Sequence, residues 1–218
     1  MAKIYNISKK KPSIFFSGLN VNITLILINV VLFFFLYFFP SDFILKNIAI
    51  SLQNVRELRL WTFLTSMFMH GNFFHLFANM FSLLFIGSLI ERILGKKRYL
   101  WFYLIAGLFG GLLYILFESF FPSNLPAVGA SGAIFGVAGL MVILTPNLPL
   151  YIMFIPIPIK AKYAIPGLLI VLWLISITGT ISIGNTAHLG GLIVGLIYGI
   201  YLKNKYKNKT RIISRYFS

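Results

Sequence analysis

The stretch GASGAIFGVAGLMVILT, residues 129–145, decides the fold of this chain. It is apolar, it opens on Ser131 among small residues, and it ends at Pro146, which stops a helix. A helix over residues 131–145 spans about 22 Å at about 1.5 Å per residue, whereas the core of a membrane is about 30 Å thick. We therefore predict a short membrane helix that begins below the outer surface of the bilayer.

The composition also indicates a membrane protein. Of the 218 residues, 59% are hydrophobic and 11% are charged, a balance that soluble domains do not show. Because backbone groups in lipid must bond within the chain, long apolar segments are expected to be helices. The predicted spans are 21–39, 68–90, 99–117, 131–145, 163–178 and 186–202. Together they define an all-α domain of six transmembrane helices over 21–202, between basic tails at 1–20 and 203–218.

The charged residues predict the orientation of the chain. Lys and Arg number 19, against 4 Asp and Glu. If the amino terminus lies inside, 16 of the 19 cations fall on inner segments, and the outer ones are Lys46, Arg56 and Arg59. The positive-inside rule then places both termini in the cytoplasm of a multi-pass protein of the cell membrane. The excess charge is explained by contact with the lipid bilayer, and no nucleic-acid partner is predicted.

The segments outside the spans differ in character. Residues 40–67 form a long and partly apolar segment, which we expect to lie partly in the membrane interface. Residues 146–162 alternate proline with bulky apolar residues, which predicts an extended connector. The cations after residue 202 indicate a solvated tail beside anionic lipid. Because cysteine is absent, a disulfide framework and a thiol nucleophile are excluded.

Ser131 raises the question of why a membrane helix would open on a hydroxyl. The first turn of a helix leaves backbone N–H groups unpaired, and at membrane depth only protein or a water-filled cavity satisfies them. We therefore predict a water-accessible cavity open to the outer face. The simplest alternative is that the Ser131 side chain caps its own helix. Further polar residues at the same depth favour a functional site.

His188 lies in the first turn of the last span, in the stretch NTAHLGGLIVG at 185–195. Glycines at a spacing of four occur both here and in the span that starts at Ser131. They are Gly191, Gly195 and Gly199 in one span and Gly132 and Gly136 in the other. Such stripes let two membrane helices approach closely. We therefore expect a hydrogen bond between Ser131 as nucleophile and His188 as its base.

The stretch HGNFFHLFANM, residues 70–80, contributes further polar side chains. His75 and Asn79 are four residues apart and share one helix face. Their N–H groups, with the backbone N–H of Ser131, are suited to stabilising the oxyanion of an acyl-transfer intermediate. His70 is expected to hold the preceding loop. A metal site is the rival explanation for three histidines, but no carboxylate or cysteine lies among them, and no metal is predicted.

A catalytic triad would also require an acid. The acidic residues of the chain are Asp42, Glu57, Glu91 and Glu118. None of them lies on the spans that carry Ser131 and His188, and only Glu118 has a depth that allows contact with the histidine. We therefore favour a Ser–His dyad.

These motifs resemble those of the rhomboid intramembrane serine proteases. The resemblance rests on GASGAIFG with Ser131, AHLGGLIVG with His188 and HGNFFHLFANM with His75 and Asn79, and GSLIERILG adds a G-x-x-x-E-x-x-x-G match through Glu91. It covers residues 20–202 and implies cleavage of transmembrane segments of other proteins near the outer face, without a cofactor. The residues expected to support the site are His70, Glu91, Gly129, Gly132, Gly191 and Gly195.

Two positions depart from the pattern of that family. Many members have Arg directly after the loop Trp, whereas Trp61 is followed here by Thr62, and Arg59 is available to anchor the loop instead. Many members also have Tyr four residues after the Ser. This chain has Phe135 there, which can pack on the histidine ring without a hydroxyl. Neither departure changes the predicted chemistry.

Two other functions compete with the protease. A rhomboid-like factor would bind membrane proteins without cleaving them, but such relatives lack the Ser or the His, and this chain has both. A small transporter or channel would carry broken helices and polar groups at the membrane midplane. The polar residues here gather near the outer ends of their helices, which favours the protease.

Overall fold

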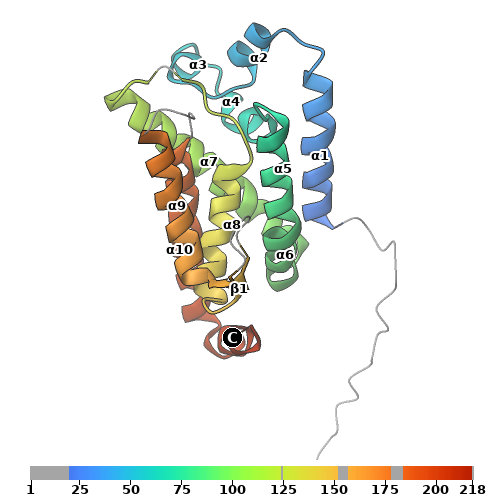
Figure 1. The fold of residues 1–218 in the computed structure, drawn as a ribbon, viewed down its shortest axis with the longest axis vertical. Coiled ribbons are helices and arrows are strands. Elements are labelled where there is room, and N and C mark those ends of the chain that lie inside the picture. The colour runs from blue at the N-terminus through green and yellow to red at the C-terminus, as the bar shows by residue number, and fades with distance from the viewer. Residues whose placement is uncertain (1–19, 124, 152–156, 178–183, 218) are drawn as a thin grey trace, which may run out of the picture.

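The structure is a computed structural model that describes residues 20–123, 125–151, 157–177 and 184–217 (Figure 1). Five of its apolar helices are single elements: α1 (Val21–Leu36), α7 (Lys96–Phe120), α8 (Ser131–Leu144), α9 (Ala161–Ile177) and α10 (Asn185–Lys205). A sixth is continuous and consists of α5 (Phe73–Ser82), the π-helical turn η2 (Leu83–Gly87) and α6 (Ser88–Leu94). Each matches one predicted span. Within the described residues, Phe73–Leu94, Lys96–Phe120 and Asn185–Lys205 are long and apolar enough to cross a membrane, and the other apolar helices are shorter.

The second span begins later than predicted. Residues Ser66–Phe68 form a 3-10 turn, η1, and α5 starts only after Asn72. The Asn72 side chain accepts a hydrogen bond from the backbone N–H of His75 at 2.8 Å. This cap sets the start of the helix because it satisfies a first-turn N–H group. His70 therefore precedes the helix, and the prediction that the span starts at residue 68 was wrong.

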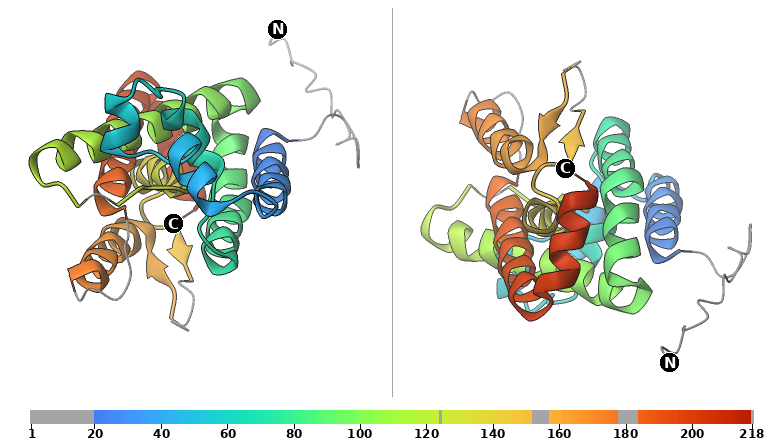
Figure 2. Two further views of the ribbon diagram at one scale, coloured as in Figure 1. Left: turned by 90° about the horizontal axis from the view of Figure 1, so that it is seen from above. Right: turned by 90° about the horizontal axis from the view of Figure 1, so that it is seen from below.

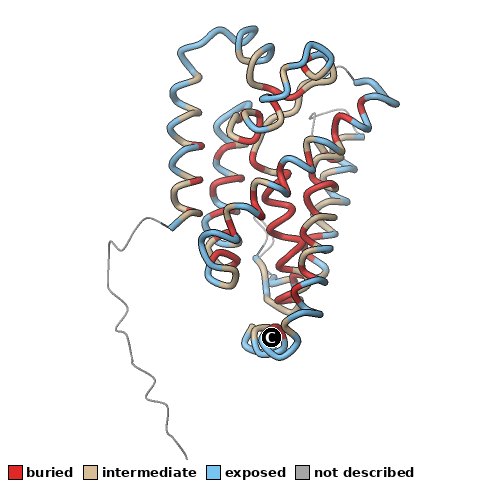
Figure 3. Tube along the Cα trace, turned by 180° about the vertical axis from the view of Figure 1, so that it is seen from behind, coloured by how far each residue is buried: buried red, intermediate tan, exposed pale blue. Residues whose placement is uncertain are grey.

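Helix α8 forms the centre of the bundle (Figures 1 and 3). Eleven of its fourteen residues are buried, whereas α1 buries three residues and lies at the edge. Helices α7 and α10 pack against α8 most extensively. Figure 3 shows the buried residues gathering on these three helices. Because protein surrounds α8, its short length is compatible with a membrane setting.

Glycines allow α8 and α10 to lie against each other. A Cβ atom on Gly191 would stand 1.8 Å from the carbonyl oxygen of Gly132, and one on Gly195 would stand 2.1 Å from that of Gly136. Both distances are far below van der Waals contact, so any side chain at Gly191 or Gly195 would force the helices apart. The two stripes of small residues thus face each other.

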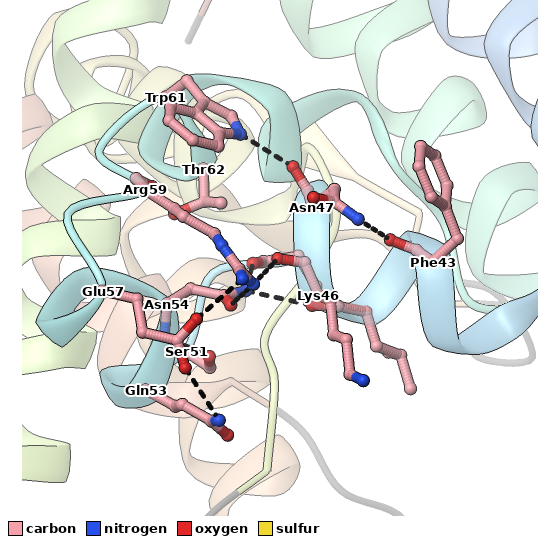
Figure 4. A network of polar contacts seen from close by, with 12 residues as sticks. Phe43, Lys46, Asn47, Ser51, Gln53, Asn54, Glu57, Arg59, Trp61 and Thr62 are labelled. Atoms are coloured by element: carbon pink, nitrogen blue, oxygen red, sulfur yellow. Dashed lines mark hydrogen bonds and ion pairs between the residues drawn. The ribbon is translucent and has the colours of Figure 1, made fainter.

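The connector between α1 and α5 forms three short helices, α2 (Ser41–Asn47), α3 (Leu52–Arg56) and α4 (Thr62–Thr65). Arg59 lies at the centre of its polar contacts (Figure 4). The guanidinium donates to the carbonyl oxygen of Lys46 at 2.6 Å and to the side-chain oxygen of Asn54 at 3.1 Å. It also forms an ion pair with Glu57 at 2.7 Å. The expectation that Arg59 anchors this loop is confirmed.

Short extended pairings occur in the connector between α8 and α9 and in the segment that leads into α8. Strand β1 (Pro149–Leu150) pairs antiparallel with β2 (Ile159–Lys160), which confirms an extended path for these parts of the connector. Residues 152–156 lie outside the described residues. Backbone hydrogen bonds of 2.8 and 3.1 Å between Ile50 and Ala127 join the first connector to the segment that enters α8.

The chain after α10 is more ordered than a solvated tail. Helix α11 (Lys207–Tyr216) follows a break at Tyr206, whose backbone leaves the helical region at ψ 44°. Figure 2 shows α11 crossing the end of the bundle, seen from below in the right-hand view. Thr210 of this helix is buried. Most residues of this segment are exposed, as expected for a solvated tail, but its helix and the buried Thr210 were not predicted.

A buried polar cluster lies where α6 meets the start of α1, and we call it the Glu91 cluster, made of Glu91, Asn22 and Tyr99. The Glu91 carboxylate accepts hydrogen bonds from the backbone N–H groups of Val21 and Asn22 at 3.0 and 2.9 Å. It therefore caps the first turn of α1 from a different helix, where a negative charge is also favoured by the helix dipole.

The glycines of the G-x-x-x-E-x-x-x-G motif make room for this cluster. The Asn22 amide donates to the Leu83 carbonyl oxygen at 2.6 Å, and its oxygen accepts from the Tyr99 hydroxyl at 2.6 Å. A Cβ atom on Gly87 would stand 2.3 Å from that Asn22 oxygen. Gly95 ends α6 at φ +81°, a conformation that favours glycine. The motif thus joins α1, α6 and α7.

Candidate active site

Ser131 is the first residue of α8. The residue before it, Ala130, stands at the N-cap position, and no side-chain hydrogen bond caps this helix. The interpretation of Ser131 as a simple helix cap is therefore wrong. Its hydroxyl oxygen instead lies 2.7 Å from Nε2 of His188, and the hydroxyl donates this hydrogen bond when Nε2 is unprotonated.

His188 is buried in the first turn of α10. The Phe135 ring stacks on it with centroids 4.6 Å apart and planes inclined by 18°, as expected for an aromatic side chain at that position. Among the described residues, Nδ1 of His188 has no hydrogen-bond partner. The Glu118 carboxylate is occupied elsewhere, because it accepts from the backbone N–H and the hydroxyl of Ser123 at 3.0 and 2.6 Å. Among the described residues, the contact between Ser131 and His188 is therefore made without a carboxylate on the other ring nitrogen.

His75 and Asn79 reach the segment that leads into Ser131. Measured from an ideal Cβ position on Gly129, Nε2 of His75 lies at 2.7 Å and Nδ2 of Asn79 at 3.5 Å. The Asn79 Nδ2 atom is buried and makes no hydrogen bond within the described part of the chain. Two side-chain donors therefore converge on the backbone two residues before Ser131.

Gly129 is required by this arrangement for two reasons. Its φ is +117°, which side chains other than glycine rarely adopt. A side chain would also collide with the His75 ring. The backbone N–H of Gly129 donates to the carbonyl oxygen of Ser66 at 2.8 Å, which fixes the segment against η1. Ser66 was not predicted, because a contact through a backbone carbonyl does not depend on residue type.

His70 interacts with the backbone of Phe68 in the preceding turn, as expected for a residue that holds this loop, although the contact does not have full hydrogen-bond geometry. Both of its ring nitrogens are buried without a hydrogen-bond partner among the described residues. Its ring also meets the His75 ring edge to face, with centroids 5.1 Å apart. In the described residues, no group of three His, Cys, Asp or Glu side chains is arranged to hold a metal ion. His70 therefore packs behind one of the two donors.

Asn185 was not among the predicted residues. Its amide donates to the Ser176 hydroxyl at 2.8 Å and so links α9 to the start of α10. His188 follows one turn later on the same helix, and Asn185 thereby helps to fix the helix end that carries it. The available signal was a polar residue at the start of an apolar span.

Comparison with known proteins identifies the class. The family model described as "Rhomboid domain" matches residues 57–205. The chain is 30% identical over 220 residues to "Rhomboid protease AarA" of Providencia stuartii, which covers 88% of this chain and 75% of that protein. It is 32% identical over 202 residues to "RHOMBOID-like protein 12, mitochondrial" of Arabidopsis thaliana, which covers 83% of this chain and 58% of that protein.

A third relative is described as inactive. "Inactive RHOMBOID-like protein 8" of Arabidopsis thaliana is 37% identical over 82 residues, which covers 38% of this chain and 22% of that protein. The chain thus spans 58% of the length of the mitochondrial relative and less of this one. The matched domain and the relatives show that this chain belongs to the rhomboid family. It is a multi-pass membrane protein with a helical bundle.

Proposed function

We propose that this chain is an intramembrane serine endopeptidase that cleaves transmembrane segments of other membrane proteins. The observation that carries the proposal is the 2.7 Å contact between the Ser131 hydroxyl and Nε2 of His188, made between two apolar helices. Serine proteases of unrelated folds pair the same two groups. Membership of the rhomboid family adds support.

In the first half of the proposed reaction, His188 Nε2 takes the proton of the Ser131 hydroxyl while Oγ attacks the carbonyl carbon of the scissile peptide. The carbonyl oxygen becomes an oxyanion that accepts hydrogen bonds from the Ser131 N–H and from the side chains of His75 and Asn79. The intermediate then expels the amine as the C–N bond breaks, and His188 gives its proton to that amine.

In the second half, water enters the site and attacks the acyl group on Ser131. His188 takes a proton from the water and returns it to the serine oxygen as the ester bond breaks. The products are a new carboxyl terminus and the restored enzyme. Because every step moves protons or peptide atoms only, no cofactor is required.

A cleavage assay tests this proposal. Purified protein in lipid vesicles is incubated with a single-span membrane protein labelled at its outer end, and products are separated on gels. We expect cleavage by the wild type and none by Ser131→Ala. Ser119→Ala is the matched control, because that exposed hydroxyl bonds only its own helix at the Leu116 carbonyl oxygen. Equal cleavage by wild type and Ser131→Ala would reject the proposal.

A non-catalytic binding factor is the second candidate, favoured by the similarity to a relative named inactive. A fluorophosphonate, which reacts only with an activated serine, separates the two. The protease predicts labelling of the wild type that is lost in Ser131→Ala and in His188→Ala. A binding factor would retain the membrane protein on an affinity resin and take up no label.

We also propose that the site opens to the outer face of the cell membrane and that both termini are cytoplasmic. The distribution of 16 of the 19 cations supports this orientation. Because the chain has no cysteine, single cysteines report it cleanly. In intact cells an impermeant maleimide should label Ser123→Cys, and it should label Tyr216→Cys only after permeabilisation. Labelling of Tyr216→Cys from outside would reverse the orientation.

A further inference from the structure

A cleft of ≈ 540 Å³ lies between the end of α10, helix α11 and the loop that follows α8. It is at the opposite end of α8 from Ser131, and Figure 2 shows this end of the bundle in its right-hand view. Its volume is within the range of about 300 to 1,000 Å³ that is typical of small-molecule sites. The proposed peptidase reaction makes no use of it.

Four cations line the cleft at a regular spacing of four residues. They are Lys203, Lys207, Arg211 and Arg215. All four are exposed, and within the part of the chain that the structure describes none of them makes an ion pair. The acidic side chains of the chain do not line the cleft. The cleft therefore concentrates positive charge that no carboxylate side chain neutralises, which favours an anionic ligand.

The position of the cleft along α10 indicates where that anion resides. The helix carries no charged residue from Asn185 to Leu202, and Lys203 is the first. In a multi-pass membrane protein, the first charge after an apolar span lies at the level of the lipid head groups. Ile143, in the last turn of α8, adds an apolar wall to the same cleft. A cationic site with an apolar wall at this level matches the chemistry of a lipid.

We propose that this cleft binds the phosphate group of an anionic membrane lipid. Lys203, Lys207 and Arg211 bind the phosphate oxygens through charge-assisted hydrogen bonds, and the glycerol end of the lipid lies against Ile143. A bound lipid would join α11 to α8 and α10. The proposal does not rest on the proteolytic activity, because binding is measured without substrate.

Native mass spectrometry of the full chain in neutral detergent tests this site. The protein is titrated with dioleoyl phosphatidylglycerol and, separately, with dioleoyl phosphatidylcholine. We expect tighter binding of phosphatidylglycerol, by about tenfold or more. Because a Lys near a lipid surface contributes about fivefold in affinity, Lys203→Gln combined with Lys207→Gln should weaken phosphatidylglycerol binding about 25-fold. Phosphatidylcholine binding should fall much less, because its choline cation offsets the charge of its phosphate.

The chain offers a closely matched control. Lys205→Gln combined with Lys209→Gln removes the same charge at the same spacing from the same segment, but neither lysine lines the cleft. This control should lose less than about threefold, since only diffuse attraction is affected. Lys203→Arg combined with Lys207→Arg keeps the charge and should keep the affinity.

Several results would overturn the proposal. An equal loss in the cleft variant and its matched control would leave only general electrostatic attraction. Equal binding of the two lipids by the wild type would exclude selection of an anionic lipid. Full competition by inorganic phosphate at the concentration of the lipid would assign the cleft to a free anion. The last two results depend on the wild type alone, so they decide the matter even if a glutamine variant fails to fold.

Discussion

Two buried polar clusters in this bundle differ in how completely their hydrogen-bonding groups are paired. In the Glu91 cluster both carboxylate oxygens accept backbone N–H groups, and both polar atoms of the Asn22 side chain are paired. In the cluster around Ser131, several buried atoms have no partner among the described residues. They are Nδ2 of Asn79, Nδ1 of His188 and both ring nitrogens of His70.

The difference indicates what each cluster is for. A buried polar group without a partner costs about 1 to 3 kcal/mol, and a ligand can recover that cost by supplying the partner. Asn29 Oδ1 and the Tyr103 hydroxyl are also unpaired among the described residues, but they lie apart from Ser131. The Glu91 cluster is complete and holds α1 to its neighbours. In the proposed mechanism, the substrate carbonyl supplies the missing partner of Asn79 Nδ2 in the Ser131 cluster. Variants of the first should therefore reduce stability, and variants of the second should reduce activity.

The largest effect is expected at the proposed dyad. Ser131→Ala and His188→Ala should each lower kcat at least about 10³-fold, because nucleophile and base act as one unit. The double variant should lose little more for the same reason. Cleavage rates of the reconstituted proteins measure this. Multiplicative losses in the double variant would show that the two side chains act separately.

The next effect concerns the proposed oxyanion donors. Loss of one such donor typically lowers kcat about 10²- to 10³-fold. Asn79→Ala and His75→Ala should therefore cleave slowly while thermal unfolding stays close to that of the wild type, since Asn79 Nδ2 has no partner to lose. Both variants should still take up a fluorophosphonate at Ser131. Wild-type rates in both would remove these residues from the mechanism.

The Glu91 cluster should respond in the reverse sense. Glu91→Gln replaces one carboxylate oxygen with an amide NH₂ group that faces backbone N–H donors, so we expect a loss of about 2 to 3 kcal/mol in unfolding free energy. Cleavage per folded molecule should stay within about threefold, because the dyad is untouched. Unfolding in mixed micelles measures the first quantity. A loss of activity without a loss of stability would break the comparison between the clusters.

A matched exposed pair sharpens this result. Glu57→Gln removes an ion pair with Arg59 whose side chains are 40% and 27% exposed. Such surface pairs contribute about 0 to 1 kcal/mol, so the effect should be clearly smaller than that of Glu91→Gln.

Much of the fold was predictable because membrane helices depend on local properties. Apolar length and proline positions locate α8, and the glycine spacing that follows Ser131 and His188 predicts that their helices meet. The start of α5 was not predictable to the residue, because it depends on Asn72 as a cap in competition with further apolar residues upstream.

Other features escaped because their partners lie far away in the sequence. Glu91 accepts hydrogen bonds from Asn22 and Val21, which lie 69 and 70 positions earlier in the chain. The local sequences of α1 and α6 do not indicate that these two helices are in contact. Helix α11 was missed because its cations dominate its composition, whereas Thr210 packs on the bundle. Gly129 was predicted as a support, but its positive φ and its contact with η1 follow only from the three-dimensional path.

The smallest effect on activity is expected for the acid that was the remaining candidate for a triad. Glu118 accepts two hydrogen bonds from Ser123, and the structure leaves Nδ1 of His188 without a partner in its described part. Glu118→Gln should therefore change cleavage by less than about threefold, since an amide oxygen keeps one of these bonds and the dyad is untouched. Asp42→Asn serves as a control for the loss of one negative charge. If Glu118→Gln proved as damaging as Ser131→Ala in a folded protein, the site would operate as a triad. Nδ1 of His188 would then have an acidic partner during the reaction, and this atom would no longer set the Ser131 cluster apart from the fully paired Glu91 cluster.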